Sequence, residues 1–246
     1  MVRVIAIDGP AASGKSSTAQ AVARRLGWAH LDSGALYRAI TLAVLDNLGN
    51  NEEGAKGKGG GWGPQRIIAL TEDLPVRLVL AGAVFRPEVA GVDVAEAIRS
   101  ERVTRRVSEI AAIPEVRHWV NVRQREAALD YPQGVVVEGR DIGTVVFPDA
   151  PLKVFLTASP EERARRRLAQ RGEAGGAGGA GGSDRTDPDE LRRETEALAA
   201  RDHADSNRAV APLRAAPDAI LLDTTDLPLE EQVQRVVALA QKRFSG

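Results

Sequence analysis

The residues best suited to chemistry stand near the N-terminus, where Gly9-Pro-Ala-Ala-Ser-Gly14-Lys15-Ser16 matches the pattern G-x-x-x-x-G-K-[ST]. The motif follows an apolar, β-branched segment and precedes a segment of helical pattern, which is the context that a phosphate-binding loop requires. In such a loop, successive backbone N–H groups and the helix N-terminus form a concave site for an anion. Gly9 and Gly14 permit turns that a Cβ would obstruct, Lys15 reaches the β- and γ-phosphates, and Ser16 can ligate Mg²⁺. The sequence therefore predicts phosphate binding here.

Two further segments place charged residues after expected strands. The apolar run 135–137 leads into Glu138-Gly139-Arg140-Asp141, and the carboxyl end of a parallel strand faces the crevice where ligands bind. A surface ion pair is the alternative interpretation of Arg140 and Asp141. In 32–38, Ser33 and Arg38 could reach a second phosphate, although a helix N-cap would explain Asp32 and Ser33 as well.

Arginines gather in two later segments, 161–171 and 201–208. Solvated charged faces and i,i+4 pairing are the ordinary explanations of such runs. Phosphoryl transfer, however, depends mainly on positioning and on stabilisation of negative charge by Lys, Arg and Mg²⁺. The clusters fit that need, whereas His30, His118 and His203 lack ligand-like spacing and are interpreted as surface or packing residues.

Strands and helices alternate along most of the chain, which predicts an α/β fold with a parallel core. Residues 75–94 break the alternation, with two short strands and a turn at Gly82, and are interpreted as an inserted subdomain. The expected strands are 2–7, 28–31, 135–137, 152–157 and 219–223. The expected helices are 16–26, 36–48, 94–129 with a break near Pro114, 161–171, 190–201 and 229–244.

Composition excludes several other classes of protein. The chain has 246 residues, no Cys and a net charge of −1, which argues against a disulfide framework, a thiolate site and a general nucleic-acid binder. No apolar stretch approaches membrane-spanning length, so a cytoplasmic protein without a membrane partner is expected. Residues 54–63 hold six of the 24 glycines and residues 172–182 hold seven, and both tracts are interpreted as flexible loop insertions.

Several motifs together resemble the bacterial cytidylate kinases, a family in the nucleoside monophosphate (NMP) kinase group. The matching stretches occur in family order and are 9–17, 32–38, 107–117, 139–151 and 205–213. The resemblance implies a P-loop NTPase core with a five-stranded parallel sheet flanked by helices, plus an NMP-binding insertion and a helical lid. The core would comprise 1–31, 131–160 and 209–246, the NMP-binding part 32–130 and the lid 161–208.

The resemblance also implies roles for individual residues. Lys15, Arg140 and Arg201 would be catalytic, and Arg163 and Arg167 of the lid would close over ATP. Arg140 would also bind CMP. The loop residues implied to bind ATP are Gly9, Pro10, Ala11, Ala12, Ser13, Gly14, Lys15, Ser16 and Ser17. The other residues implied to bind CMP are Ser33, Tyr37, Arg38, Ser108, Arg117, Asp141, Asp205 and Arg208.

The implied reaction is ATP-dependent phosphorylation of CMP and dCMP by a monomer, with Mg²⁺ as cofactor and Ser16 as its ligand. Asp141 could accept a hydrogen bond from the cytosine amino group, where uracil presents an oxygen. Two alternatives remain open: another small-substrate P-loop kinase, and a non-catalytic nucleotide-binding regulator. Ala12 departs from many nucleotide kinases, which have Gly there, so the local loop geometry is expected to differ slightly.

Overall fold

The structure is a computed structural model that describes residues 3–49, 62–174, 187–208 and 210–244. The chain divides into two compact units. The first contains residues 1–4 and 23–138, and the second contains residues 5–22 and 139–246. The implied lid therefore belongs to the same unit as the phosphate loop. The two glycine tracts lie mostly outside the described residues.

The first unit is built on a mixed sheet whose central pairs are parallel. Strand β2 (Ala29–Asp32) pairs in parallel with β6 (Val135–Gly139) on one side and with β4 (Val84–Val89) on the other. Strands β3 (Val76–Ala81) and β5 (Val92–Asp93) add to β4 in antiparallel fashion. Gly82, with φ of +64°, makes the turn between β3 and β4, as the sequence predicts.

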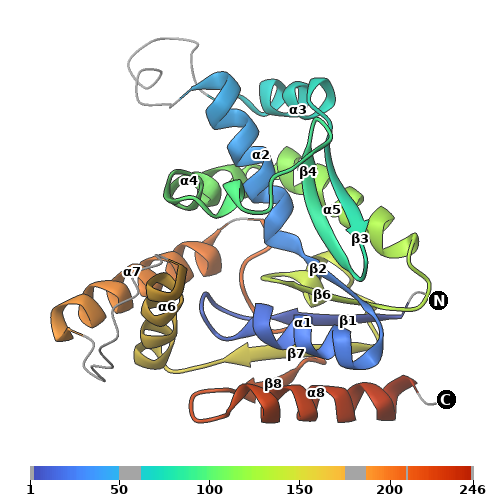
Figure 1. Ribbon diagram of the computed structural model, residues 1–246, viewed down its shortest axis with the longest axis vertical. Coiled ribbons are helices and arrows are strands. Elements are labelled where there is room, and N and C mark those ends of the chain that lie inside the picture. The colour runs from blue at the N-terminus through green and yellow to red at the C-terminus, as the bar shows by residue number, and fades with distance from the viewer. Residues whose placement is uncertain (1–2, 50–61, 175–186, 209, 245–246) are drawn as a thin grey trace. The chain divides into compact units, whose positions relative to one another are not determined.

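Helices pack together on this unit (Figure 1). Their buried apolar side chains form a large core. They are α2 (Ser33–Leu48), α3 (Pro64–Asp73), η2 (Ala97–Arg99), α4 (Glu101–Ala112) and α5 (Pro114–Leu129). Helix α2 is buried along most of its length and packs against α4, η2 and β4. Gly49, with φ of +73°, follows its last residue, and Pro114 occupies the first turn of α5, so both helix boundaries follow from local chemistry.

The second unit contains the parallel strands β1 (Val4–Asp8), β7 (Leu152–Thr157) and β8 (Ile220–Asp223), with β7 between the other two. Its helices are α1 (Lys15–Leu26), the short π-helix η3 (Ile142–Val146), α6 (Pro160–Ala174), α7 (Pro188–Asn207) and α8 (Leu229–Phe244). Helix α8 packs on β7, and its Val233, Val236, Val237 and Ala240 are buried, as predicted.

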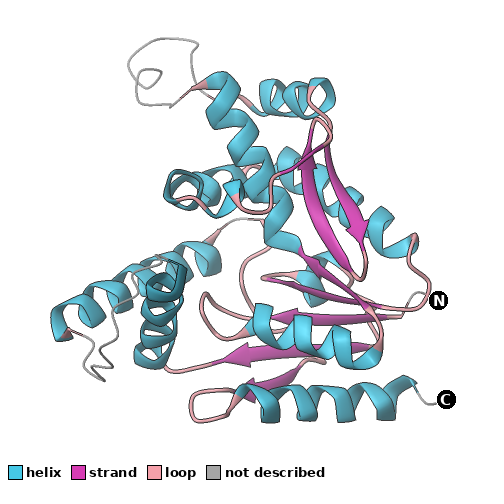
Figure 2. Cartoon of the chain, viewed as in Figure 1, coloured by secondary structure: helices cyan, strands magenta, loops and turns pink. Residues whose placement is uncertain are grey.

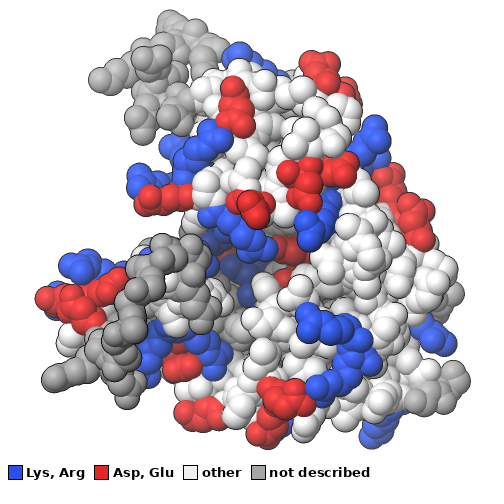
Figure 3. Space-filling view, in the orientation of Figure 1, with Lys and Arg blue, Asp and Glu red and all other residues white. Residues whose placement is uncertain are grey.

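The predicted α/β class is confirmed: the described strands pair mostly in parallel, and helices alternate with them along the chain (Figure 2). Helix α3 and η3 are elements that the sequence did not predict. Among the described residues, no helix has the length and apolar character needed to cross a membrane. Acidic and basic side chains are interspersed on the face drawn in Figure 3, in keeping with 33 basic and 34 acidic residues.

Candidate phosphoryl-transfer site

The loop between β1 and α1 has the backbone geometry of a phosphate-binding loop. Gly9 has φ of +151°, and a Cβ there would lie 2.2 Å from the carbonyl oxygen of Leu156 on β7. Gly14 has φ of +89°. Ala12 adopts φ of +57°, a left-handed conformation that costs a residue with a Cβ about 1–2 kcal/mol. Ala12 thus occupies a conformation usual for Gly, and the loop tolerates the strain.

Lys15 and Ser16 begin α1 at the end of this loop. The Lys15 side chain is buried, and its Nζ donates to the carbonyl oxygen of Pro10 at 2.5 Å, with Ser13 Oγ at 3.5 Å. The ammonium group therefore lies within the loop whose N–H groups would receive an anion. Ser16 is exposed in the first turn of the helix. A cation held by this hydroxyl would take its remaining ligands from water and phosphate.

One protein hydroxyl together with water and phosphate oxygens is a set of ligands that fits Mg²⁺. This ion keeps several waters and commonly binds through few protein ligands together with substrate phosphates. Across the described ranges, no group of three or more His, Cys, Asp or Glu side chains could hold a metal ion. The chemistry at Ser16 is therefore compatible with a cation that arrives with a nucleotide, and it does not resemble a closed protein cage.

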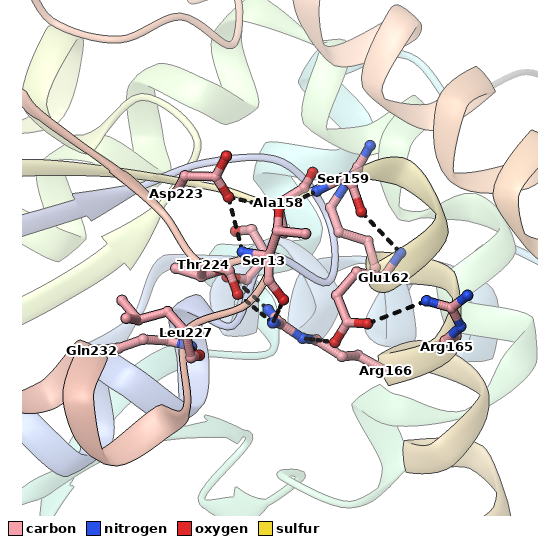
Figure 4. Close-up of polar contacts among 12 residues, drawn as sticks. Ser13, Ala158, Ser159, Glu162, Arg165, Arg166, Asp223, Thr224, Leu227 and Gln232 are labelled. Carbon is pink, nitrogen blue, oxygen red and sulfur yellow. Dashed lines mark hydrogen bonds and ion pairs between the residues drawn. The ribbon is translucent and has the colours of Figure 1, made fainter. Parts of the chain in front are cut away.

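A polar network supports the phosphate loop from β8 and α6 (Figure 4). Thr224 Oγ1 accepts a hydrogen bond from Arg166 at 3.0 Å and lies 3.1 Å from the carbonyl oxygen of Ser13. Arg166 also donates to Glu162 at 2.9 Å. From α8, Gln232 Oε1 accepts from Thr18 of α1 at 2.9 Å. The loop is thus fixed at Ser13, and the helix that follows it is fixed at Thr18.

The helices α6 and α7 meet the loop through Arg163 and Asp202. The buried Arg163 guanidinium donates to the carbonyl oxygen of Ala11 at 3.2 Å and forms an ion pair with Asp202. Asp202 in turn accepts from the backbone N–H of Ala11 at 3.2 Å. Ala11 also packs with the buried Ala164 and Leu198 of the same two helices. The backbone N–H and the carbonyl of Ala11 are therefore both engaged by α6 and α7.

A cluster of arginines and carboxylates lies beyond this contact, still within the second unit. Arg140 Nε is 3.0 Å from Asp205 Oδ2, and Arg208 Nη2 is 3.6 Å from Asp141 Oδ1. Burial, followed by the charge of Arg140, lowers the pKa of Arg201. The positive potential at a half-buried guanidinium group close to other guanidinium groups strongly attracts an anion. The predicted residues 140, 141, 201, 205 and 208 are thus brought together.

Asp8, which the sequence analysis did not single out, connects the phosphate loop to this cluster. Its carboxylate accepts from the backbone N–H groups of Ile142 at 2.8 Å and Gly143 at 2.7 Å. Burial raises the pKa of Asp8 to about 6, an effect that these two hydrogen bonds oppose. The only local signal for its role is its position, directly between the strand and Gly9.

Ser33, Tyr37, Arg38, Ser108 and Arg117 lie in the first unit, on helices α2, α4 and α5. Asp32 caps this helix by accepting from Gly34 N at 2.8 Å, so the N-cap interpretation is confirmed for Asp32. Arg38 donates to the carbonyl oxygen of Ile98 at 3.1 Å and to Thr104 Oγ1 at 2.9 Å. Ser33 is buried beside the cap, in the first turn of α2.

Tyr37 and Arg117 contact each other, with the guanidinium carbon 5.5 Å from the ring centroid. Arg117 is buried and donates to the carbonyl oxygen of Ala111 at 3.0 Å, near the end of α4. Ser108 is half-buried on α4. The first unit therefore contains a group of candidate binding residues that includes Arg38, Tyr37 and Arg117. Within this group, the planar guanidinium of Arg117 stacks on the ring of Tyr37.

A buried polar contact between β2 and β6 was not predicted from the sequence. His30 Nε2 lies 3.1 Å from Glu138 Oε1, and both side chains are buried. Burial and then the charge of Glu138 raise the pKa of Asp32. His30 is thus a packing residue, whereas His118 and His203 are exposed. Both findings agree with the interpretation of the three histidines as surface or packing residues.

The fold and the phosphate loop define a P-loop phosphotransferase with an arginine-rich site in the same unit as its loop. A family model described as cytidylate kinase matches residues 5–242. The chain is 43% identical to the cytidylate kinase of Pseudomonas savastanoi pv. phaseolicola, over 99% of this chain and 97% of that one. It is 44% identical to the cytidylate kinase of Azotobacter vinelandii, with the same coverage. The chain belongs to the cytidylate kinase family.

Among solved structures, a shikimate kinase from Bacteroides thetaiotaomicron is similar to the chain with a TM-score of 0.43 and 16% identity. The similarity covers 97% of this chain and 98% of that one.

Proposed function

We propose that the chain catalyses the transfer of a phosphoryl group from ATP to CMP and dCMP, giving ADP with CDP or dCDP. The observation that carries this proposal is the combination of a complete phosphate loop with the Arg140–Asp141–Asp205–Arg208 cluster, in a member of the cytidylate kinase family. A loop alone would fit many nucleotide-binding proteins. The arginines and carboxylates of the cluster supply groups that can position an acceptor and stabilise the charge of the transferred phosphoryl group.

In this proposal the donor phosphates lie in the loop formed by residues 9–17. Backbone N–H groups and the amino end of α1 bind the phosphates, and Lys15 exchanges the carbonyl of Pro10 for phosphate oxygens. Mg²⁺, held through Ser16, would neutralise charge on the phosphates when bound. Arg201 and Arg140 stabilise the negative charge of the transferred group, because a partly desolvated guanidinium gains most from a nearby anion.

Two sets of residues are proposed to bind the acceptor nucleotide. In the first unit, Arg38 binds the CMP phosphate together with Ser33, and the group around Arg117 contacts the cytosine. That group also includes Tyr37 and Ser108. In the second unit, Asp141 accepts from the cytosine amino group, Asp205 and Arg208 bind sugar and base, and Arg140 also contacts the phosphate.

The two lid arginines receive different roles in the proposal. Arg167 contributes to the positive field at Arg201, so it is assigned to the donor phosphates. Arg163 bonds to Ala11 and Asp202, so it is assigned to holding α7 against the phosphate loop. Exclusion of water by these helices would limit hydrolysis of ATP. We further propose that the protein acts in the cytoplasm as a monomer.

The rival functions predict different outcomes in one experiment. The parent and Lys15→Ala are incubated with ATP, Mg²⁺ and CMP, and CDP is measured in a single turnover. We expect the parent to form CDP and the variant to lose most of its rate, because the loop then lacks its only ammonium group. A non-catalytic nucleotide binder would form no CDP in either protein, and this result would overturn the proposal.

A further inference from the structure

Asp8 is the last residue of β1 and directly precedes Gly9 of the phosphate loop. Asp8 is 5% exposed, and its carboxylate accepts two backbone hydrogen bonds, one at each oxygen. Oδ1 accepts from Ile142 N at 2.8 Å, and Oδ2 accepts from Gly143 N at 2.7 Å. A bidentate contact of this kind fixes the distance and the orientation of the two segments that it joins.

The two N–H groups belong to the first residues of η3, where helical N–H groups have no partner within the helix. Asp141 is the N-cap of η3, and aspartate is a favourable capping residue. Its side chain nevertheless makes no capping hydrogen bond, and its Oδ1 lies 3.6 Å from Arg208 Nη2. Asp8 thus performs the capping that Asp141 would ordinarily perform, and the Asp141 carboxylate is directed to Arg208.

Close packing at Gly143 also restricts the position of η3. A Cβ added to Gly143 would lie 3.1 Å from Lys153 Cδ and 3.4 Å from Asp8 Oδ2. The Lys153 ammonium is itself held by Asp218 at 2.9 Å and by the carbonyl oxygen of Pro148. Gly143 therefore packs against two anchored side chains, and a displacement of η3 would disturb both contacts.

We propose that Asp8 is a positioning residue for the acceptor nucleotide, which holds the Arg140–Asp141 segment in register with the phosphate loop by capping η3. The proposal rests on the proposed function, because Arg140 and Asp141 are the residues there assigned to CMP. Asp8 acts through these two residues and does not touch the substrate itself. It therefore affects the binding and discrimination of CMP more than the binding of ATP.

The protonation state of Asp8 gives this role a pH dependence. Its carboxylate faces Asp141, which raises its pKa, and Lys15, which lowers it. With the pKa at about 6, Asp8 is mostly ionised at pH 7.5 and mostly protonated at pH 5. A protonated carboxyl group carries a hydrogen on one oxygen, so it accepts less well from two N–H donors. The two hydrogen bonds that hold η3 to Asp8 should therefore weaken at low pH.

The test compares the parent with Asp8→Asn, using CMP and UMP as acceptors. The side-chain amide that this substitution introduces would turn an NH₂ group toward one of the two N–H donors. At pH 7.5 we expect KM for CMP to rise on the order of tenfold, the preference for CMP over UMP to fall, and KM for ATP to change less than about twofold. Asp226→Asn, at an exposed aspartate of the same unit, is the matched control and should leave all three unchanged.

A pH profile separates positioning from a purely structural role. The ratio of KM for CMP between variant and parent should shrink toward one as the pH falls from 7.5 to 5, because the parent then loses its own carboxylate. The phosphate of CMP also titrates near pH 6, but it does so equally for both proteins. Amide hydrogen exchange should in addition be faster at Ile142 and Gly143 in the variant.

If Asp8→Asn does not fold, Gly143→Ala provides the same test from the other side of the contact. Its Cβ would press η3 away from Lys153 and Asp8, so the same rise in KM for CMP is expected. The proposal is overturned if a folded variant keeps the parent's KM for CMP and its preference over UMP, or if the KM ratio does not change with pH. Absence of CMP phosphorylation by the parent would instead overturn the proposed function.

Discussion

Carboxylates hold three of the guanidinium groups that are assigned to the site. Arg140 pairs with Asp205, Arg163 with Asp202, and Arg208 lies within reach of Asp141. An arginine held in this way keeps its orientation and loses less rotamer freedom when an anion arrives. The carboxylates must then either share the guanidinium or exchange it for a group of the nucleotide. Asp141 is proposed to make such an exchange.

Replacing Asp141 tests that role directly. For Asp141→Ala we expect the preference for CMP over UMP to fall by about 1–3 kcal/mol, the range for a lost contact to a base edge, while ATP binding changes little. The measurement is kcat/KM for both acceptors and KM for ATP. Asp226→Ala is the matched control at an exposed position. Full retention of the CMP preference by Asp141→Ala would show that another group reads the base.

Single residues were predictable from the sequence where a fixed local pattern carries the chemistry. Lys15 and Ser16 follow from the loop motif, and Asp32 from its place before a helix. Asp8 was not predictable, because its role depends on a contact with Ile142, 134 residues away. The strain at Ala12 was also invisible in the sequence, since a substitution for Gly does not reveal whether the backbone keeps the left-handed conformation.

Among the elements, α1 and α8 are joined beside the phosphate loop by a buried polar pair. Thr18 Oγ1 donates to Gln232 Oε1 at 2.9 Å, and Gln232 Nε2 donates to the carbonyl oxygen of Leu227 at 2.6 Å. Gln232 Oε1 also lies 3.2 Å from the position of a Cβ on Gly14. The start of α8 therefore packs directly against the loop that is proposed to hold ATP.

Thr18→Val removes the hydroxyl at nearly constant shape. We expect it to lower the free energy of unfolding by about 1–3 kcal/mol, because Gln232 Oε1 is left buried without its donor. Thr41→Val is the matched control: its hydroxyl bonds to the Tyr37 carbonyl, which also faces the backbone N–H of the same helical turn. That control should cost much less in urea unfolding. Equal losses for both variants would contradict the structural role of the α1–α8 pair.

The expected strands and most helices are found near their predicted boundaries, because apolar periodicity and local caps determine them. Helix α3 was missed since it begins at Pro64 directly after a glycine tract, whose composition dominates the local pattern. The segment of η3 is rich in β-branched residues, which favour strands. Capping by Asp8 and packing against Lys153 override this propensity, and neither is local in sequence.

At the scale of the whole molecule, the titration of Asp8 makes the free energy of unfolding depend on pH. Its pKa rises from the ordinary 3.8 to about 6 in the folded chain, so the folded state binds more protons between these values. The contribution of this extra proton binding to the free energy of unfolding is complete below pH 3.8 and is lost as the pH rises through 6. A shift of this size corresponds to about 3 kcal/mol.

Other groups also titrate, so the parent is compared with Asp8→Asn in urea unfolding at several pH values. The stability advantage of the parent over the variant should fall by about 2–2.5 kcal/mol between pH 4 and pH 7. An advantage that stays constant, or that grows with pH, would mean that the hydrogen bonds from Ile142 and Gly143 outweigh the burial of this carboxylate.

The class of the whole molecule was predicted from the sequence. The alternation of strands and helices indicates an α/β fold, and the family resemblance is confirmed by the family model over residues 5–242. The division at residues 4, 22 and 138 separates β1 from β2 and places α6 and α7 with the phosphate loop. Which elements pack into one unit depends on contacts between distant residues, which a pattern along the chain does not record.

The most direct test of the central claim is the acceptor specificity of the purified protein. With ATP and Mg²⁺ held constant, kcat/KM is measured for CMP, dCMP, AMP and GMP. Phosphorylation of CMP and dCMP far faster than that of AMP and GMP is the predicted result, because Asp141 and Arg117 are proposed to select cytosine. AMP phosphorylation equal to or faster than that of CMP would contradict the account.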